Sequence, residues 1–317
     1  MKIDEELNEK IKIQISEIEL KSVKENTREI SKRYRENNAT GKKLIKNNKE
    51  AATYAIYRMP STYCATYSVL KHVLEINKFS IKNCIDIGAG TGAATWAIHN
   101  VFDLDKILCL EYQEEMMNIG KKIMENTSLK NVEWKKFNIC TDEIKNKSDL
   151  IITSYMINEL REDEKEKAIL KMWNSTNNLL VIIEPGTPNG FKNILKAREI
   201  LLNNGANIVS PCCNSNKCQI KDDDWCSFYV RLDRSGIQRM VKDGELGYED
   251  EKFSYIVVSK EKLLNNKISR ILRHPQINTG FVKVKICTEN GIEEKTISKR
   301  MGEIYKKVKK LDAGDII

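Results

Sequence analysis

Apolar residues follow two different spacings along the chain. Up to about residue 76 they recur every three or four positions, which predicts amphipathic helices. The first such stripe comprises Leu7, Ile11, Ile15 and Ile18. The sequence Asn37–Gly41 breaks this pattern, and a second helical stretch follows at 49–76. Pro60 lies inside that stretch and has no N–H to donate, so we expect the helix to stop or kink there.

From residue 81 short apolar runs alternate with amphipathic stretches. The expected strands are 83–87, 107–110, 132–134, 150–153 and 179–183. The expected helices are 91–100, 116–124, 161–174 and 191–202. Strands separated by helices predict an α/β fold with a doubly wound, mainly parallel sheet. Beyond it we expect strands at 253–258 and 281–287 and a lysine-rich helix at 303–311.

The chain has 317 residues, of which 41% are hydrophobic and 31% charged, and this composition excludes wholesale disorder. We expect an N-terminal helical region at 1–78, a Rossmann-like domain at 79–205 and a C-terminal region at 206–317. No apolar run approaches the roughly 20 residues that span a bilayer. The first residues also lack the basic and then apolar pattern of a secretory signal. We therefore expect a soluble, cytoplasmic monomer with no membrane partner.

A glycine-rich turn joins the first predicted strand to its helix. It reads D-x-G-x-G-x-G and comprises Asp86, Gly88, Gly90 and Gly92. Glycine lets the backbone approach a ligand closely, and the N-terminus of the next helix adds a favourable dipole. A NAD-type site is disfavoured because dinucleotide binding favours the spacing G-x-G-x-x-G. An acid before the glycines suits a ligand with amino and carboxylate ends, and the turn resembles the first motif of class I methyltransferases.

A second acid supports a site for S-adenosylmethionine. Glu111 ends the second predicted strand, where a carboxylate can accept hydrogen bonds from both ribose hydroxyls. The predicted cofactor-binding residues are Asp86, Gly88, Gly90, Gly92 and Glu111; a tight turn that binds nothing is the alternative. The fourth strand is followed by Ser154–Met156, without the Asn/Asp-Pro-Pro-aromatic sequence common in enzymes that methylate amino groups of nucleic acids. No catalytic residue can be named from this sequence.

Cysteines crowd into one short segment. Four of the nine are Cys212, Cys213, Cys218 and Cys226, and Cys287 follows far downstream. Structural zinc sites usually have closer C-x-x-C pairs, so four thiols from an irregular loop and a distant strand favour a 4Fe–4S cluster over zinc. Free cysteine is also a common buried hydrophobe, which is the alternative explanation. Cys213 is an alternative to Cys212 as the first ligand.

Positive charge is concentrated near the C-terminus. The net charge is +8, and residues 260–310 contain 14 Lys and Arg against 5 Asp and Glu. The whole basic excess therefore lies in this segment. Such a patch is typical of a protein that binds nucleic acid, although a solvated lysine-rich helix would look the same.

Several motifs together resemble a known family. In chain order they are Arg58-Met59-Pro60, the glycine turn, Glu184-Pro185-Gly186, Pro211-Cys212, Asp224-Trp225-Cys226, Arg231 and Arg234, Tyr248 to Tyr255, Gly302-Glu303-Ile304-Tyr305 and Gly314-Asp315. Over residues 50–317 the chain is similar to the methyltransferase-like family that includes assembly factors of the mitochondrial small ribosomal subunit and their bacterial relatives.

The resemblance implies a class I methyltransferase fold, a bound 4Fe–4S cluster and binding to the small ribosomal subunit and its rRNA. By position, the cluster ligands are Cys212, Cys218, Cys226 and Cys287. The family commonly has Cys-Pro-His at the first ligand, where this chain has Cys212-Cys213-Asn214. The basic segment 260–310 would contact phosphates. A role in subunit assembly, with or without rRNA methylation, is the main hypothesis. An RNA methyltransferase not confined to the ribosome and a small-molecule methyltransferase are the alternatives.

Overall fold

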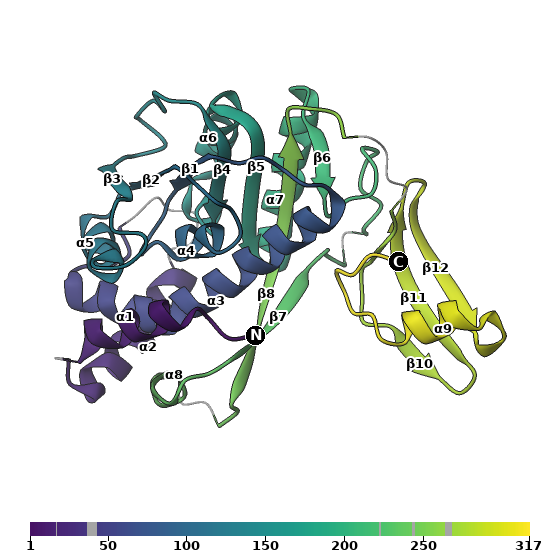
Figure 1. Cartoon of the computed structure of the whole chain (residues 1–317), viewed down its shortest axis with the longest axis horizontal. Helices are drawn as coiled ribbons and strands as arrows, with labels where there is room; N and C mark the ends of the chain where they lie inside the picture. Colours follow the sequence, from purple (N-terminus) through teal and green to yellow (C-terminus); the bar gives the residue numbers. More distant parts are fainter. Residues whose placement is uncertain (17, 37–42, 222, 243–244, 264–267) are drawn as a thin grey trace.

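The computed structural model describes residues 1–317 except 17, 37–42, 222, 243–244 and 264–267. Its large sheet has eight strands in the order β3-β2-β1-β4-β5-β8-β6, with β7 paired to β8 (Figure 1). The strands are β1 (Asn83–Ile87), β2 (Lys106–Glu111), β3 (Glu133–Lys136), β4 (Ser148–Ser154), β5 (Thr176–Pro185), β6 (Asn207–Ser210), β7 (Phe228–Asp233) and β8 (Tyr248–Ser259).

Strands β1 to β5 pair in parallel, whereas β8 is antiparallel to β5, β6 and β7. The chain builds outward from β1 in one direction to β3 and in the other to β5, which is the doubly wound order. The prediction of a doubly wound, mainly parallel, Rossmann-like sheet is confirmed.

Helices cover both faces of the central part of this sheet, which explains why the central strands β1, β4 and β5 contain continuous apolar runs. On β5, Leu179, Val181 and Ile183 join one core cluster, and the alternate residues Leu180 and Ile182 join another. The first cluster lies under α1 (Glu5–Ile15), α2 (Leu20–Glu36), α3 (Asn48–Ile76), α4 (Ala93–His99) and α5 (Glu114–Met124). The second lies under η1 (Ile157–Glu159), α6 (Glu162–Asn174) and α7 (Pro188–Asn203).

The N-terminal helices are present as expected, but the prediction that a helix stops at Pro60 is wrong. Helix α3 continues through Pro60 over 29 residues. Proline cannot donate to the carbonyl of Ile56 four residues earlier. The side chain of Gln238, from helix α8 (Gly236–Val241), donates to that carbonyl instead, at 3.5 Å. Burial of Pro60 and this replacement donor keep the helix intact. The predicted break at Asn37–Gly41 lies outside the described residues.

A second, four-stranded sheet follows the large one. Its elements are β9 (Arg270–Ile271), β10 (Gln276–Asn278), β11 (Phe281–Thr288), β12 (Gly291–Ser298), η2 (Lys299–Met301) and α9 (Glu303–Val308). They enclose a small apolar core that includes Val284, Ile286 and Val308. The predicted region 206–317 thus divides between the two sheets, because β6, β7 and β8 pair within the large one.

Within the described part of the chain, no helix combines the length and apolar character that crossing a membrane requires.

Candidate cofactor and metal sites

The first candidate site is a cavity of about 260 Å³ at the carboxyl ends of β1, β2 and β4. Gly88, Gly90 and Glu111 line it, so three of the five predicted cofactor residues meet there. Gly88 has a φ of +68°, and a Cβ at that position would lie 2.7 Å from the side chain of Met156. Only glycine fits this turn without strain.

The side chain of Glu111, at the end of the second strand, is hydrogen-bonded to the glycine turn. One oxygen of its carboxylate accepts the N–H of Gly90 and the other accepts that of Gln113, each at 2.7 Å. Burial raises the pKa of Glu111, while these backbone donors lower it. A carboxylate oxygen can accept more than one hydrogen bond, so both retain capacity for ribose hydroxyls.

The remaining two predicted residues lie behind the cavity. Asp86 is 1% exposed and accepts a 2.7 Å hydrogen bond from Thr95 of α4. It borders a smaller adjoining space of about 30 Å³ together with Gly88 and Gly90. Burial raises the pKa of Asp86 to about 7. Gly92 has a φ of +87° and is the N-cap of α4. Asp86 and Gly92 thus both connect the glycine turn to helix α4.

Residues from distant segments complete the cavity, and sequence reasoning missed them. They include Tyr34 of α2, Tyr54 of α3, Asn138, Tyr155, Glu159 and Glu164. Burial, followed by the charges of Glu111 and Glu184, raises the pKa of Glu159 to about 8. Apart from the position of Tyr155 after the fourth strand, no local pattern marks these residues.

Tyr155 is held in a conformation that tyrosine rarely adopts. Its φ is +64°, in the left-handed region. Its hydroxyl donates to Glu251 of β8 at 2.8 Å, and Arg58 of α3 donates twice to the same carboxylate, at 2.8 and 2.9 Å. The Arg58 guanidinium also lies 4.7 Å from the centre of the Tyr155 ring. This network of three side chains fixes one wall of the cavity.

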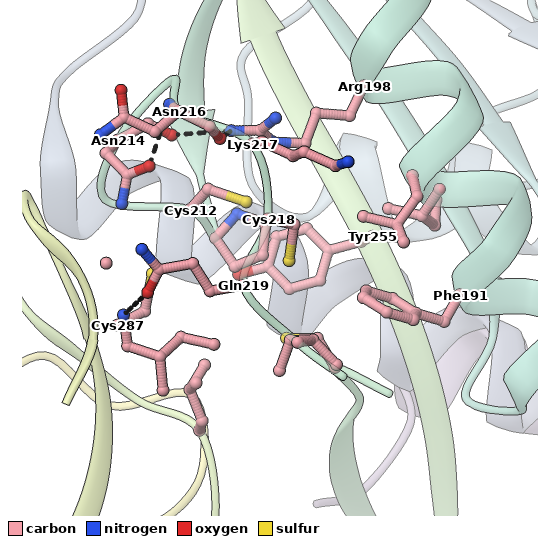
Figure 2. Close-up of a pocket in the computed structure, with 18 of the residues that line it drawn as sticks. Phe191, Arg198, Cys212, Asn214, Asn216, Lys217, Cys218, Gln219, Tyr255 and Cys287 are labelled. Atoms are coloured by element: carbon pink, nitrogen blue, oxygen red, sulfur yellow. Dashed lines mark hydrogen bonds between the residues drawn. The ribbon is translucent and has the colours of Figure 1, made fainter. Parts of the chain in front are cut away.

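The second candidate site is a cavity of about 50 Å³ between the large sheet and β11 (Figure 2). All four predicted metal ligands line it, namely Cys212, Cys218, Cys226 and Cys287. Cys213 does not; with Cys212 it borders a separate space that also includes Ile76 and Lys262. Cys212 therefore lines the cavity with the other three cysteines, whereas Cys213 lies outside it, in contact with Cys287.

Hydrogen bonds tie the cysteine loop to both sheets. Arg198 of α7 donates to the carbonyls of Asn214 and Asn216, at 3.0 and 2.7 Å. Asn214 in turn donates to the carbonyl of Thr288, the residue after Cys287, at 2.6 Å. The bond from Asn214 joins the loop to the distant strand, and Figure 2 shows Arg198 beside Asn214 and Asn216.

Burial raises the pKa of two of the four thiols, Cys212 and Cys226. Burial raises the pKa of Cys212 to about 11 and opposes ionisation of the free thiol, whereas the nearby Arg198 lowers it. A hydrogen bond from Cys213 lowers the pKa of Cys287. Arg198 and Arg270 each retain a buried N–H group without a hydrogen-bond partner. These cations can compensate the negative charge of thiolates.

Among the described residues, no three His, Cys, Asp or Glu side chains are close enough together to hold a single metal ion. A four-iron cluster is held differently, by thiolates placed around a body of several atoms. Four cysteines facing one cavity match that donor set.

A family model described as "Mitochondrial small ribosomal subunit Rsm22" matches residues 48–317. The chain belongs to this family. The resemblance inferred from the motifs is thereby confirmed, and the match includes every predicted cofactor and metal residue.

Two curated relatives of the family are similar over much of the chain. The human "Ribosome assembly protein METTL17, mitochondrial" is 22% identical over 226 residues, which are 65% of this chain and 48% of the relative. The Schizosaccharomyces pombe "Rsm22-cox11 tandem protein 2, mitochondrial" is 23% identical, over 84% of this chain and 43% of the relative. The chain thus spans about half the length of the curated relatives it matches.

Solved methyltransferase structures are also similar. A SAM-dependent methyltransferase from Aquifex aeolicus has 16% identity and a TM-score of 0.43, over 68% of this chain and all of that chain (100%). The N-methyltransferase NodS from Bradyrhizobium japonicum, solved with S-adenosyl-L-homocysteine, has 12% identity and a TM-score of 0.41, over 62% and 85% of the two chains.

The names of the relatives correct one expectation. The sequence predicted a cytoplasmic protein, but the family description and both relatives are mitochondrial by name, which points to mitochondria instead. The prediction rested on the absence of a secretory signal, which does not distinguish these two compartments.

The Arg58–Glu251 pair offers a direct test of how the cavity wall is held. Glu251→Gln removes the charge that balances a largely buried guanidinium, so we expect the free energy of unfolding to fall by about 3 kcal/mol in urea denaturation. Asp250→Asn is the matched control, because the neighbouring Asp250 makes a similar pair with Arg231 that is more exposed. It should cost less than about 1 kcal/mol. Equal effects of the two variants would contradict this role for Glu251.

Proposed function

We propose that this chain is an assembly factor of the small ribosomal subunit that binds S-adenosylmethionine and a 4Fe–4S cluster. The match to the small-subunit family over residues 48–317 carries the proposal. The human relative is named a ribosome assembly protein, which supports the same role here. The chain spans about half the length of its relatives. The role is therefore proposed on the basis of the two candidate sites that this chain itself contains.

Exposed positive charge on the second sheet supports an RNA partner. The exposed basic residues there are Lys283, Lys295, Lys299, Arg300, Lys306, Lys307, Lys309 and Lys310. Other cations of the segment are used inside the protein: Lys285 and Arg273 pair with Asp224, and Arg270 is buried. We therefore propose that rRNA phosphates contact the exposed basic side chains on the strands of this sheet and around helix α9.

Methylation of rRNA is a second candidate function. The observation in its favour is the position of Tyr155, whose side chain lines the cofactor cavity at the carboxyl end of β4. In this fold substrates meet the cofactor at the carboxyl ends of the strands. A labelled methyl donor, incubated with small subunits and the chain, would leave label in the recovered RNA if transfer occurs.

Glu111 provides the first test of the proposed function. Glu111→Ala removes the acceptor for the ribose hydroxyls, so the affinity for S-adenosylmethionine in isothermal titration calorimetry should fall about tenfold or more. Glu114→Ala, which removes an exposed carboxylate at the start of α5, should leave it unchanged. Unchanged affinity in Glu111→Ala would remove the proposed site.

The cysteine cavity predicts a metal content that can be measured. Protein purified without oxygen should be brown and contain about four irons per chain. Cys218→Ser should lose this iron, whereas Cys213→Ser and Cys140→Ser should keep it, because neither of those thiols lines the cavity. Zinc in place of iron, or loss of iron in Cys213→Ser alone, would overturn the assignment.

The exposed lysines predict salt-sensitive binding to small ribosomal subunits. Co-sedimentation should weaken by about tenfold or more between 50 and 200 mM salt. Charge reversal at Lys306 and Lys307 should weaken binding at low salt, whereas reversal at the exposed Lys121 and Lys122 of α5 should not. Binding that does not change with salt would point to a partner other than nucleic acid.

A further inference from the structure

The charge of the cofactor cavity is one-sided. Glu111 and Glu164 line it as carboxylates, and Glu159 lines it with a pKa that burial raises to about 8, so that it is mostly neutral at pH 7. No Lys, Arg or His lines it among the described residues. A cavity lined by acids attracts cations and repels phosphates. Its chemistry therefore suits a positively charged ligand without a phosphate group.

Aromatic rings surround the same cavity. Tyr34, Tyr54 and Tyr155 line it, and the rings of Tyr34 and Tyr54 stack with their centres 5.7 Å apart. Arg58 already lies over the ring of Tyr155, where Glu251 balances its charge. Tyr34 and Tyr54, together with Tyr112 and Phe137, which also line the cavity, are thus the aromatic surface left to a bound cation. An aromatic face attracts onium groups.

The hydroxyl of Tyr34 lies in the electrostatic field of the cavity acids. Burial raises the pKa of Tyr34 well above its ordinary value, and Tyr54, Glu159 and Glu111 add to this effect. Carboxylates and phenol rings from α2, α3, β2 and η1 thus converge on one space. The combination of acid and aromatic groups is what a sulfonium or ammonium ligand requires.

Tyr34 belongs to a segment that lies before the residues matched by the family model, which begin at 48. The segment is nevertheless fixed to the cavity. Arg33 pairs with Glu50 of α3 at 2.7 Å, and the backbone N–H of Ile45 donates to the side chain of Gln113, a cavity residue, at 3.0 Å. Val23, Thr27 and Ile30 are buried on the same face of α2 as Tyr34, because these positions are spaced by three and four residues.

We propose that Tyr34 contacts the cofactor and makes this cavity bind a sulfonium more tightly than the neutral thioether of the same nucleoside. The proposal deepens, and rests on, the binding of S-adenosylmethionine proposed above. S-adenosylhomocysteine lacks the methyl group and the positive charge of the sulfonium. The acids and rings of the cavity therefore do not stabilise its sulfur atom in this way. The cavity would then retain the methyl donor and release the demethylated form.

The test is calorimetric titration of the full chain with S-adenosylmethionine, S-adenosylhomocysteine and sinefungin, in which a protonated amine replaces the sulfonium methyl group. The unaltered chain should bind the two cations, S-adenosylmethionine and sinefungin, more tightly than the thioether, S-adenosylhomocysteine. Tyr34→Leu should weaken S-adenosylmethionine about fivefold or more and change S-adenosylhomocysteine less than about twofold. Tyr34→Phe, which keeps the ring, should retain the preference.

The matched control is Tyr67→Leu, which removes a partly buried tyrosine stacked on Tyr63 of α3, away from the cavity. It should leave both affinities unchanged. If the unaltered chain binds both cations no more tightly than the thioether, or if Tyr34→Leu lowers all affinities equally, the role of Tyr34 is overturned while donor binding stands. If none of the three ligands binds, donor binding itself fails and the inference fails with it.

Discussion

Strand β8 is the constraint on which both candidate sites depend. It pairs antiparallel with β5 on one side and with β6 and β7 on the other, so it joins the parallel strands to the end of the sheet. Near its start, Glu251 fixes Arg58 and Tyr155 at the cofactor cavity. Three residues later, Ser254 donates to the carbonyl of Cys226 at 2.7 Å, and Tyr255 lines the cysteine cavity. A single buried strand therefore supports two sites of different chemistry.

The parallel half of the fold could be predicted because its signals are local. Apolar runs bounded by helices identify β1 to β5, and the glycines identify the turn that they allow. The role of β8 could not be predicted, since its partner β5 lies far away in the sequence and its second half is buried continuously, without the alternation that marks a half-exposed antiparallel strand. Pro60 failed as a helix breaker for a related reason. Its lost hydrogen bond is replaced by Gln238, about 180 residues downstream, and no local rule contains that donor.

The residues of the candidate sites likewise include some that local sequence patterns predict and some that they do not. Glu111 and the glycines were predicted from spacing, and the structure brings Gly88, Gly90 and Glu111 to one cavity. The tyrosines and Glu159 come from other elements and were missed. The cysteines were chosen from their density, yet their placement around one cavity requires the second sheet. Asn214 attaches the cysteine loop to β11 at Thr288, and Gln219 attaches it to β12 at Ile292. Composition suggested the cysteines, and tertiary hydrogen bonds place them around the cavity.

The central claim is that a cofactor cavity and a cluster site lie on either side of β8 in one chain. A crystal structure determined without oxygen at the iron absorption edge, with S-adenosylmethionine added, tests it most directly. The account predicts anomalous density for a compact group of irons among Cys212, Cys218, Cys226 and Cys287, and the nucleoside beside Gly88 and Glu111. A single metal ion, density bound through Cys213, or a nucleoside elsewhere would contradict it.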